Sequence, residues 1–202
     1  MFNRKTRKGF TLIELLVVIA IIAVLSVVVI LTLNPAELLR QARDSNRISD
    51  LATMKSAISL FEADVTTSSQ VAIGVYGTLY TASAQATTTT STYVGAAAGN
   101  WGFLALSVAT LNKSSSRAID GTGWIPVNFA AISSGSPIGN EPVDPANDNV
   151  DYYVYSPSST VFKFGAKVES SKYGSPTSGS NVTANDGGNN TSTLEAGTNL
   201  SL

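Results

Sequence analysis

The residue types in this chain restrict the chemistry that its side chains can perform. The 202 residues include no histidine and no cysteine, which excludes imidazole catalysis, thiol nucleophiles, disulfides and Cys/His zinc sites. Among the remaining groups, Asp120, Glu141 and Asp144 are candidates for a general acid/base pair of carboxylates. Their spacing in the sequence does not place them together, so we expect the protein not to be an enzyme.

A second group of residues with chemical potential lies near the N-terminus. The run Lys8-Gly9-Phe10-Thr11-Leu12-Ile13-Glu14 joins a basic segment to a long apolar segment that ends at Leu33. Glu14 is the one charged residue between Phe10 and Leu33. A carboxylate inside a membrane-spanning helix costs a few kcal/mol and is a functional candidate by default. Close to the start of the helix, it can also reach back to the water among the lipid headgroups.

The apolar segment has the length of a membrane span. Leu12 to Leu33 is 22 residues, and at ~1.5 Å each a helix of that length spans roughly 33 Å, close to a hydrocarbon core of about 30 Å. The basic residues before it predict a cytoplasmic N-terminus. A secretory signal has a shorter apolar stretch and a small-residue cleavage site. An uncleaved single-pass anchor carrying a binding domain fits the length but gives Glu14 no role.

Residues 8–14 and the apolar run resemble the processing site of type IV prepilins and of the related pseudopilins of type II secretion. The resemblance rests on the glycine, the phenylalanine, the glutamate four residues later and the apolar run. It implies that a dedicated aspartyl peptidase removes the leader, residues 1–9, by cutting after Gly9, and that Phe10 is then N-methylated. It also implies that Glu14 pairs with the α-amine of Phe10 in a neighbouring subunit and so sets the register of a filament.

Asn34 and Pro35 predict a helix break between the apolar helix, residues 10–34, and an amphipathic helix, residues 35–65. Asparagine suits an N-cap, proline the first helical position, and Glu37 can complete a capping box; a proline kink in one continuous helix is the alternative. Apolar residues then recur every three or four positions, at Ile48, Leu51, Met54, Ile58, Phe61 and Val65. We expect this stripe to pack on a sheet, with Arg40/Asp44 and Arg47/Asp50 paired on the exposed side.

Residues 66–169 are expected to form a globular head. Thr87–Thr90 lies in a Ser/Thr-rich surface region, residues 101–111 are expected to form a short apolar helix, and residues 123–129 a strand or packed segment. Aromatic and β-branched residues predict a hairpin at about 150–169, with a turn at Ser156–Ser159. Residues 170–202 are rich in Ser, Gly, Asn and Thr, which favours a flexible tail.

The expected fold class is α+β. A long N-terminal helix, membrane-spanning in its first half, is expected to pack its amphipathic second half on a small antiparallel sheet head, as the resemblance to pilins implies. Major pseudopilins bind calcium near the C-terminus, and Asp144, Asp148 and Asp151 offer oxygen ligands here. Asp and Asn beside proline are also ordinary turn residues, so we expect no metal and no other cofactor.

These observations predict a structural subunit of a type IV pilus-like filament. Its partners would be copies of itself, the membrane, the prepilin peptidase, and an assembly machinery with its ATPase and inner-membrane platform. Residues 10–202 carry nine basic against 14 acidic residues, so no nucleic-acid binding is indicated. The precursor would lie N-in across the cytoplasmic membrane and the product in an extracellular pilus, since the Ser/Thr/Asn-rich tail suits a surface filament. A pseudopilin in a periplasmic pseudopilus is the alternative.

Overall fold

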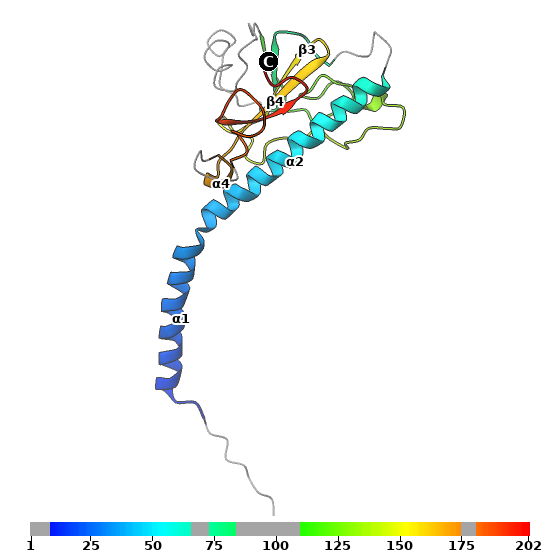
Figure 1. Ribbon diagram of the computed structural model, residues 1–202. Coiled ribbons are helices and arrows are strands. Elements are labelled where there is room, and N and C mark those ends of the chain that lie inside the picture. The colour runs from blue at the N-terminus through cyan, green and yellow to red at the C-terminus, as the bar shows by residue number, and fades with distance from the viewer. Residues whose placement is uncertain (1–8, 66–72, 84–109, 175–180) are drawn as a thin grey trace, which may run out of the picture. The chain divides into compact units, whose positions relative to one another are not determined.

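The computed structural model describes residues 9–65, 73–83, 110–174 and 181–202 (Figure 1). The chain is α+β and divides into two compact units, residues 1–39 and 40–202. The first unit contains the apolar helix α1 (Leu12–Leu33). Helix α2 (Pro35–Asp64) begins in the first unit, and its larger part belongs to the second unit together with a five-stranded sheet.

Helix α1 satisfies its polar groups without outside partners. Ser26 and Thr32 donate their hydroxyls to the carbonyls of Ile22 at 2.8 Å and Val28 at 3.0 Å, so neither hydroxyl is left unbonded in an apolar environment. Residues 12–30 are long and apolar enough to cross a membrane, with a mean hydropathy of 3.2. No other helix among the described residues has that length and composition.

Asn34 separates the two helices. Its backbone takes the left-handed conformation (φ 41°, ψ 70°) and ends α1, while its side-chain Oδ1 accepts from the N–H of Glu37 at 3.4 Å. Pro35 is the first residue of α2, a position where the missing N–H costs nothing and the fixed φ favours the helix. One asparagine therefore ends the first helix and caps the second.

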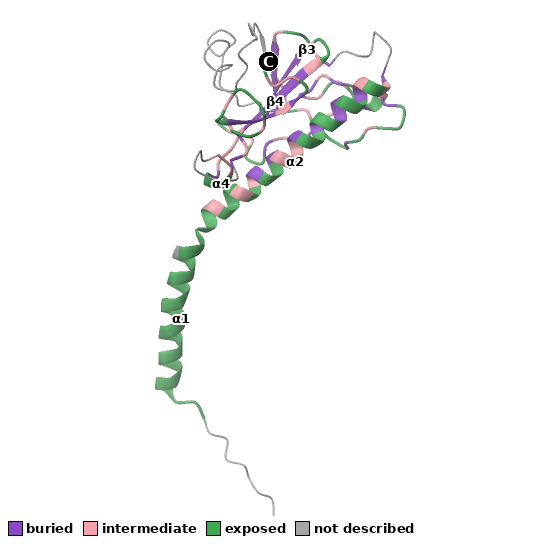
Figure 2. Ribbon diagram, in the orientation of Figure 1, coloured by how far each residue is buried: buried purple, intermediate pink, exposed green. Residues whose placement is uncertain are grey.

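Helix α2 packs one face into the core of the head. Its buried and exposed residues alternate along the helix, as Figure 2 shows. The buried apolar residues of this face are Leu51, Met54, Ala57, Ile58 and Phe61. They form one cluster with aromatic residues of the sheet, such as Phe162 and Phe164, and with Trp124. Trp124 lies in the long loop between residues 113 and 154. The 3.6-residue period of the stripe thus places one face of α2 against the sheet.

The sheet has the strand order β2-β1-β3-β4-β5. Its strands are β1 (Thr78–Thr81), β2 (Thr110–Lys113), β3 (Val154–Ser158), β4 (Val161–Lys167) and β5 (Thr193–Gly197). The other short elements are a 3-10 helix, η1 (Phe129–Ala131), and one helical turn, α4 (Ser171–Gly174). Strands β1 and β2 run parallel and every other pair is antiparallel. The expectation of a purely antiparallel sheet was therefore wrong.

Strands β3 and β4 form a hairpin with a tighter turn than the sequence suggested. Ser158 pairs with Val161, so the turn consists of Ser159 and Thr160, and Ser159 has a positive φ of 59°. Pro157 lies within β3, opposite Phe162. The proline and serines that suggested a four-residue turn at Ser156–Ser159 belong mostly to the strand.

Residues 193–197 of the C-terminal segment form a strand of the sheet, which differs from the flexible tail expected at 170–202. Strand β5 pairs with β4 from Lys163↔Gly197 to Lys167↔Thr193, and Leu194 is 7% exposed within the core cluster. Backbone pairing and a few buried side chains, among them Leu194 and Leu202, hold a segment whose side chains are mostly small and polar. The composition of the segment carried no signal of this pairing.

Other expected elements of the head differ or lie outside the described residues. Thr87–Thr90 and most of the expected helix at 101–111 are not described, and its last two residues, Thr110 and Leu111, are in strand β2. Residues 123–129 form no regular strand. They are a packed segment in which Trp124, Ile125, Val127 and Phe129 are buried.

The ordered C-terminal segment yields a test on stability. Replacing Leu194 by Ala removes a buried side chain from the core and is expected to lower the free energy of unfolding by about 2 to 4 kcal/mol. Denaturant unfolding of the full chain in detergent, followed by near-ultraviolet circular dichroism, measures this change. Ser192→Ala, on the exposed residue two positions earlier, is the control and is expected to change little. A flexible tail would make the two variants alike.

Candidate functional site: the N-terminal segment

The peptide bond between Gly9 and Phe10 lies immediately outside helix α1. Residues 9–11 are non-helical, and Thr11 is extended (φ −82°, ψ 152°). Phe10 is 86% exposed, and no heavy atom lies within 4 Å of the place that a Cβ on Gly9 would take. A protease requires an accessible backbone outside regular structure, and this bond has both properties.

Glu14 forms a capping box with Thr11 at the start of α1. Its Oε2 accepts from the N–H of Thr11 at 2.8 Å and from the Thr11 hydroxyl at 2.7 Å, while the Glu14 N–H donates to Thr11 Oγ1 at 3.3 Å. The negative charge thus lies at the positive end of the helix dipole. In the single chain the carboxylate therefore already has partners, one turn from Phe10.

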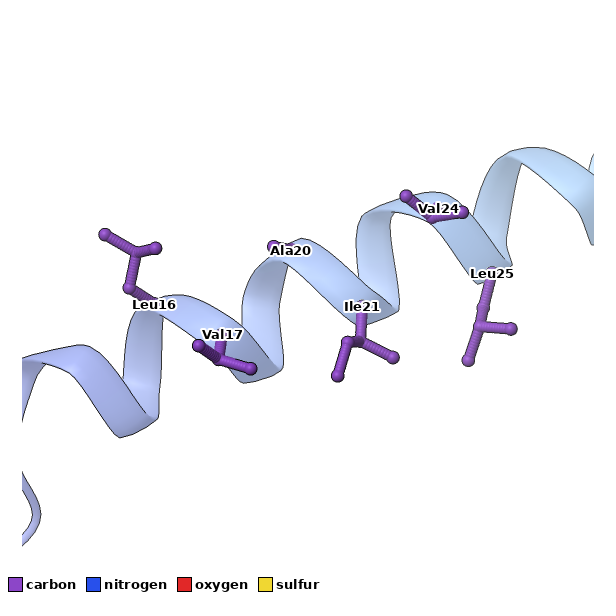
Figure 3. A pocket seen from close by; sticks show the side chains of 6 residues that line it. All are labelled: Leu16, Val17, Ala20, Ile21, Val24 and Leu25. Atoms are coloured by element: carbon purple, nitrogen blue, oxygen red, sulfur yellow. The ribbon is translucent and has the colours of Figure 1, made fainter.

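The remainder of α1 presents only hydrocarbon and hydroxyl groups to its surroundings. Its large apolar side chains are about half exposed or more, from Leu12 at 82% to Val18 at 48%. Figure 3 shows six side chains projecting from the helix within residues 16–25, all of them aliphatic: Leu16, Val17, Ala20, Ile21, Val24 and Leu25. A surface of this kind is stable only when lipid or other apolar helices cover it.

Comparison with known families identifies this segment. Residues 4–30 match the family model of the prokaryotic N-terminal methylation motif. The chain carries the signature of a type IV pilin or pseudopilin precursor. No curated protein and no solved structure matches it. The matched residues include the exposed Gly9–Phe10 bond, the capping box and the apolar part of α1 through Ile30.

The motif and helix α1 together indicate a membrane-anchored precursor. The motif also implies processing by a prepilin peptidase and handling by a pilus or secretion machinery. It is a structural motif and not an enzymatic one.

Thr11 is a residue of this site that we did not assign from the sequence. The pattern Thr11-Leu12-Ile13-Glu14 is the S/T-x-x-E capping box directly before an apolar run. It was therefore readable from the sequence.

The head contains a buried cluster of charges that we expected on the surface. Arg47 is fully buried and binds Asp144 through two hydrogen bonds, of 2.6 and 2.9 Å. It also binds Asp44 at 2.7 Å and Glu169 at 2.6 Å. This Arg47 cluster connects α2 to the long loop at Asp144 and to the chain after β4.

The expected exposed pairs Arg40/Asp44 and Arg47/Asp50 were therefore wrong. Asp44 is buried, and its carboxylate also accepts the N–H groups of Glu169 at 3.1 Å and Ser170 at 2.7 Å. Asp50 accepts the hydroxyl of Tyr153 at 2.8 Å. These charges pack against the head, because the face of α2 that they occupy continues the apolar stripe toward the N-terminus.

Two of the three calcium candidates, Asp144 and Asp148, accept hydrogen bonds from other groups of the protein. Asp144 gives both oxygens to Arg47. Asp148 accepts the N–H groups of Val150 and Asp151, at 2.7 and 2.8 Å, in a turn, and these bonds lower its pKa. Asp151 is half-buried, and burial raises its pKa. No group of three or more metal-binding side chains occurs in the part of the chain that the structure describes.

The three carboxylates considered for acid/base chemistry also have separate structural partners. Asp120 accepts the N–H and hydroxyl of Thr122 at 3.0 and 2.6 Å. Glu141 is fully buried, and its Oε2 accepts the N–H of Ile125 at 3.0 Å. Burial raises the Glu141 pKa to about 8. A carboxyl group that is protonated at neutral pH carries no charge and so needs no positively charged partner when buried. The Glu141 carboxyl packs directly against Gly123, where a Cβ would overlap it.

The Arg47 cluster predicts a pH dependence of stability. Hydrogen bonds from Arg43, and then from Arg47, lower the pKa of Glu169 from 4.5 to about 2. Because the folded state binds this proton more weakly, the stabilisation is complete above pH 4.5 and is lost as the pH falls toward 2. Glu169→Gln is expected to remove this part of the acid dependence, measured as the free energy of unfolding at successive pH values.

Glu62→Gln is the control for that measurement. Burial raises the pKa of Glu62, so its titration falls above the window in which Glu169 acts. The acid slope should stay at the wild-type value in this variant. An unchanged slope in Glu169→Gln would show that the pairing with Arg43 and Arg47 contributes no stability.

Proposed function

We propose that this protein is the structural subunit of a type IV pilus-like filament. The observation that carries the proposal is the exposed Gly9–Phe10 bond directly before a capped, apolar helix whose one charge is Glu14. Cleavage after Gly9 leaves Phe10 as the new N-terminal residue, and the α-amine of Phe10 is the group that becomes methylated. The cut also removes Arg4, Lys5, Arg7 and Lys8, the basic residues that keep the N-terminus of the precursor on the cytoplasmic side.

Helix α1 serves two successive environments in this proposal. In the precursor, lipid covers its apolar side chains. In the filament, copies of the same helix cover one another, so a subunit leaves the bilayer without exposing α1 to water. The peptidase, the ATPase and the inner-membrane platform are separate proteins that act on this chain.

During assembly, the Glu14 carboxylate gains a new partner in a neighbouring subunit, either in place of Thr11 or in addition to it. In the single chain its Oε2 caps Thr11, whereas the α-amine of Phe10 in a neighbouring subunit brings a positive charge. In an apolar bundle an unpaired carboxylate is costly, about 3 to 5 kcal/mol when one partner of a buried pair is missing. Correct axial offset between subunits restores the pair, so the charge selects one register.

A periplasmic pseudopilus is the second use of the same N-terminal segment. One reason for favouring a surface pilus was an exposed, flexible tail, and strand β5 removes that reason. The other, Thr87–Thr90, lies outside the described residues. The motif is common to both uses, so the location of the processed chain distinguishes them.

Mass spectrometry of the N-terminal peptide tests the processing step. We expect a peptide that begins at Phe10 and carries one added methyl group, found in filaments sheared from cells. The same peptide confined to membranes would indicate the pseudopilus. An intact Met1, or a cut beyond Leu33, would contradict both and leave an uncleaved anchor or a secreted domain.

Two matched variants separate the capping role of Glu14 from its role between subunits. Glu14→Gln keeps an oxygen that can accept from Thr11 but removes the charge, whereas Thr11→Val keeps the charge and removes the hydroxyl. We expect Glu14→Gln to insert and to be cut normally but to reduce filaments at least tenfold. Thr11→Val is expected to assemble. Sheared protein, normalised to the membrane-bound amount, measures both.

The opposite pattern would contradict the intersubunit pair. If Glu14→Gln assembles normally and Thr11→Val does not, the carboxylate acts only as a helix cap. Normal cleavage after Gly9 in both variants shows that each chain reached the membrane, so a loss of filaments then reports assembly alone.

A further inference from the structure

Lys163 lies at the centre of a cluster of polar groups on the side of the sheet away from the aromatic core. Its side chain is fully buried and forms an ion pair with Glu195 of the neighbouring strand β5. Its Nζ also donates to the side-chain Oδ1 of Asn189 at 2.9 Å and to the carbonyl of Leu200 at 2.9 Å. An amine, a carboxylate and a carboxamide are therefore in contact within one cluster, the Lys163 cluster.

The loop before β5 is shaped around the carboxylate. Glu195 Oε2 accepts the N–H of Asn190 at 2.9 Å, and Asp186 accepts the N–H groups of Gly188 at 2.8 Å and Glu195 at 2.7 Å. A Cβ on Gly188 would overlap the Glu195 carboxylate, so only glycine allows this approach. These contacts hold the side chain of Asn189 against the amine.

The surroundings favour a reactive amine. Burial lowers the pKa of Lys163, and the negative charge of Glu195 opposes that change. Burial also raises the pKa of Asp186, the other acidic group that faces the cluster. A desolvated lysine beside a carboxylate that can take its proton is a usual form of activated nitrogen nucleophile. Asn189 itself is exposed, which leaves a path for a small product to escape.

We propose that Lys163 and Asn189 become joined by an intramolecular isopeptide bond, with Glu195 carrying the protons. The lysine Nζ forms a new C–N bond to Asn189 Cγ, and the bond from Cγ to Nδ2 breaks. Starting from the ammonium–carboxylate pair, both protons lost by Nζ end on Nδ2, which leaves as ammonium. No electrons are gained or lost, so no further reactant is needed.

The bond would fix the C-terminal segment of a chain that has no cysteine. It connects β4 to the loop that precedes β5, and so closes the chain between residues 163 and 189. A covalent link of this kind restricts the unfolded chain in the way a disulfide does. It would also prevent β5 from separating from β4 when the head is pulled.

Peptide mapping of the full chain tests the bond. The protein is purified in detergent, denatured and digested with trypsin. We expect residues 118–167 joined to residues 173–202, because the modified Lys163 is no longer cleaved, with a combined mass lower than the sum by one ammonia. Separate peptides of unmodified mass, one of them ending at Lys163, would overturn the proposal and leave a noncovalent ion pair.

Four variants establish which groups form the bond. Lys163→Arg and Asn189→Ala are expected to give only unlinked peptides, whereas Asn190→Ala, the neighbouring asparagine, should remain linked. Asn189→Asp would link with loss of water in place of ammonia. Glu195→Gln is expected to lower the linked fraction at least tenfold. Near-ultraviolet circular dichroism confirms for each variant that the head is folded.

Two outcomes in folded variants would contradict the mechanism. Loss of ammonia that persists in Lys163→Arg would show that Asn189 reacts with its own backbone. A wild-type linked fraction in Glu195→Gln would show that Glu195 does not carry the protons.

Discussion

A single carboxylate at the start of an apolar helix is the constraint on which the use of this chain depends. Glu14 is the one charge between Phe10 and Leu33, and its contacts to Thr11 satisfy it at the helix terminus. There the charge interacts favourably with the helix dipole. The precursor can therefore insert without burying an unpaired ion. In the proposed processing, the same charge lies next to the residue that cleavage would convert into a cation. Insertion and the proposed assembly would thus make different demands on one side chain, and its position one turn from Phe10 would meet both.

The head is organised by two buried cations. Arg47 forms ion pairs with Asp44, Asp144 and Glu169, which lie in α2, in the long loop and in the chain after β4. Lys163 forms an ion pair with Glu195 of β5 and donates hydrogen bonds to the side-chain oxygen of Asn189 and the carbonyl of Leu200. Each cation fixes segments far apart in the sequence to the α2–sheet core. A buried charge that is fully paired contributes more to specifying one arrangement than to net stability, and here it adds to the apolar contacts that loop residues such as Trp124 and Ile125 make with the core.

The elements recovered from the sequence are those with a local physical signal. The span and start of α1 follow from an uninterrupted apolar run, the break from Asn34 and Pro35, and the buried face of α2 from residues three and four apart. The motif that contains Gly9, Phe10 and Glu14 is equally local, because its spacing lies within one helical turn and the residues before it; the roles of these three residues stay predictions. The parallel pairing of β1 with β2 joins distant segments through backbone groups, which every residue type supplies. The sequence consequently contained little that could predict it.

The errors over charge and over the tail have one cause. From composition, Asp, Glu, Lys and Arg are expected at the surface and Ser-, Gly- and Asn-rich segments are expected to be flexible. Both expectations assume that polar groups are hydrated and are not bonded to other parts of the protein. Here Asp44 and Arg47 share a face with the apolar stripe, so folding supplies their partners from the chain at 144 and 169. The C-terminal segment is fixed in the same way, since β5 brings Glu195 to Lys163, and Gly188 permits the close approach. Of the nine basic residues outside residues 1–9, Arg47 and Lys163 are fully buried. Each of these two charges joins segments that are distant in the sequence.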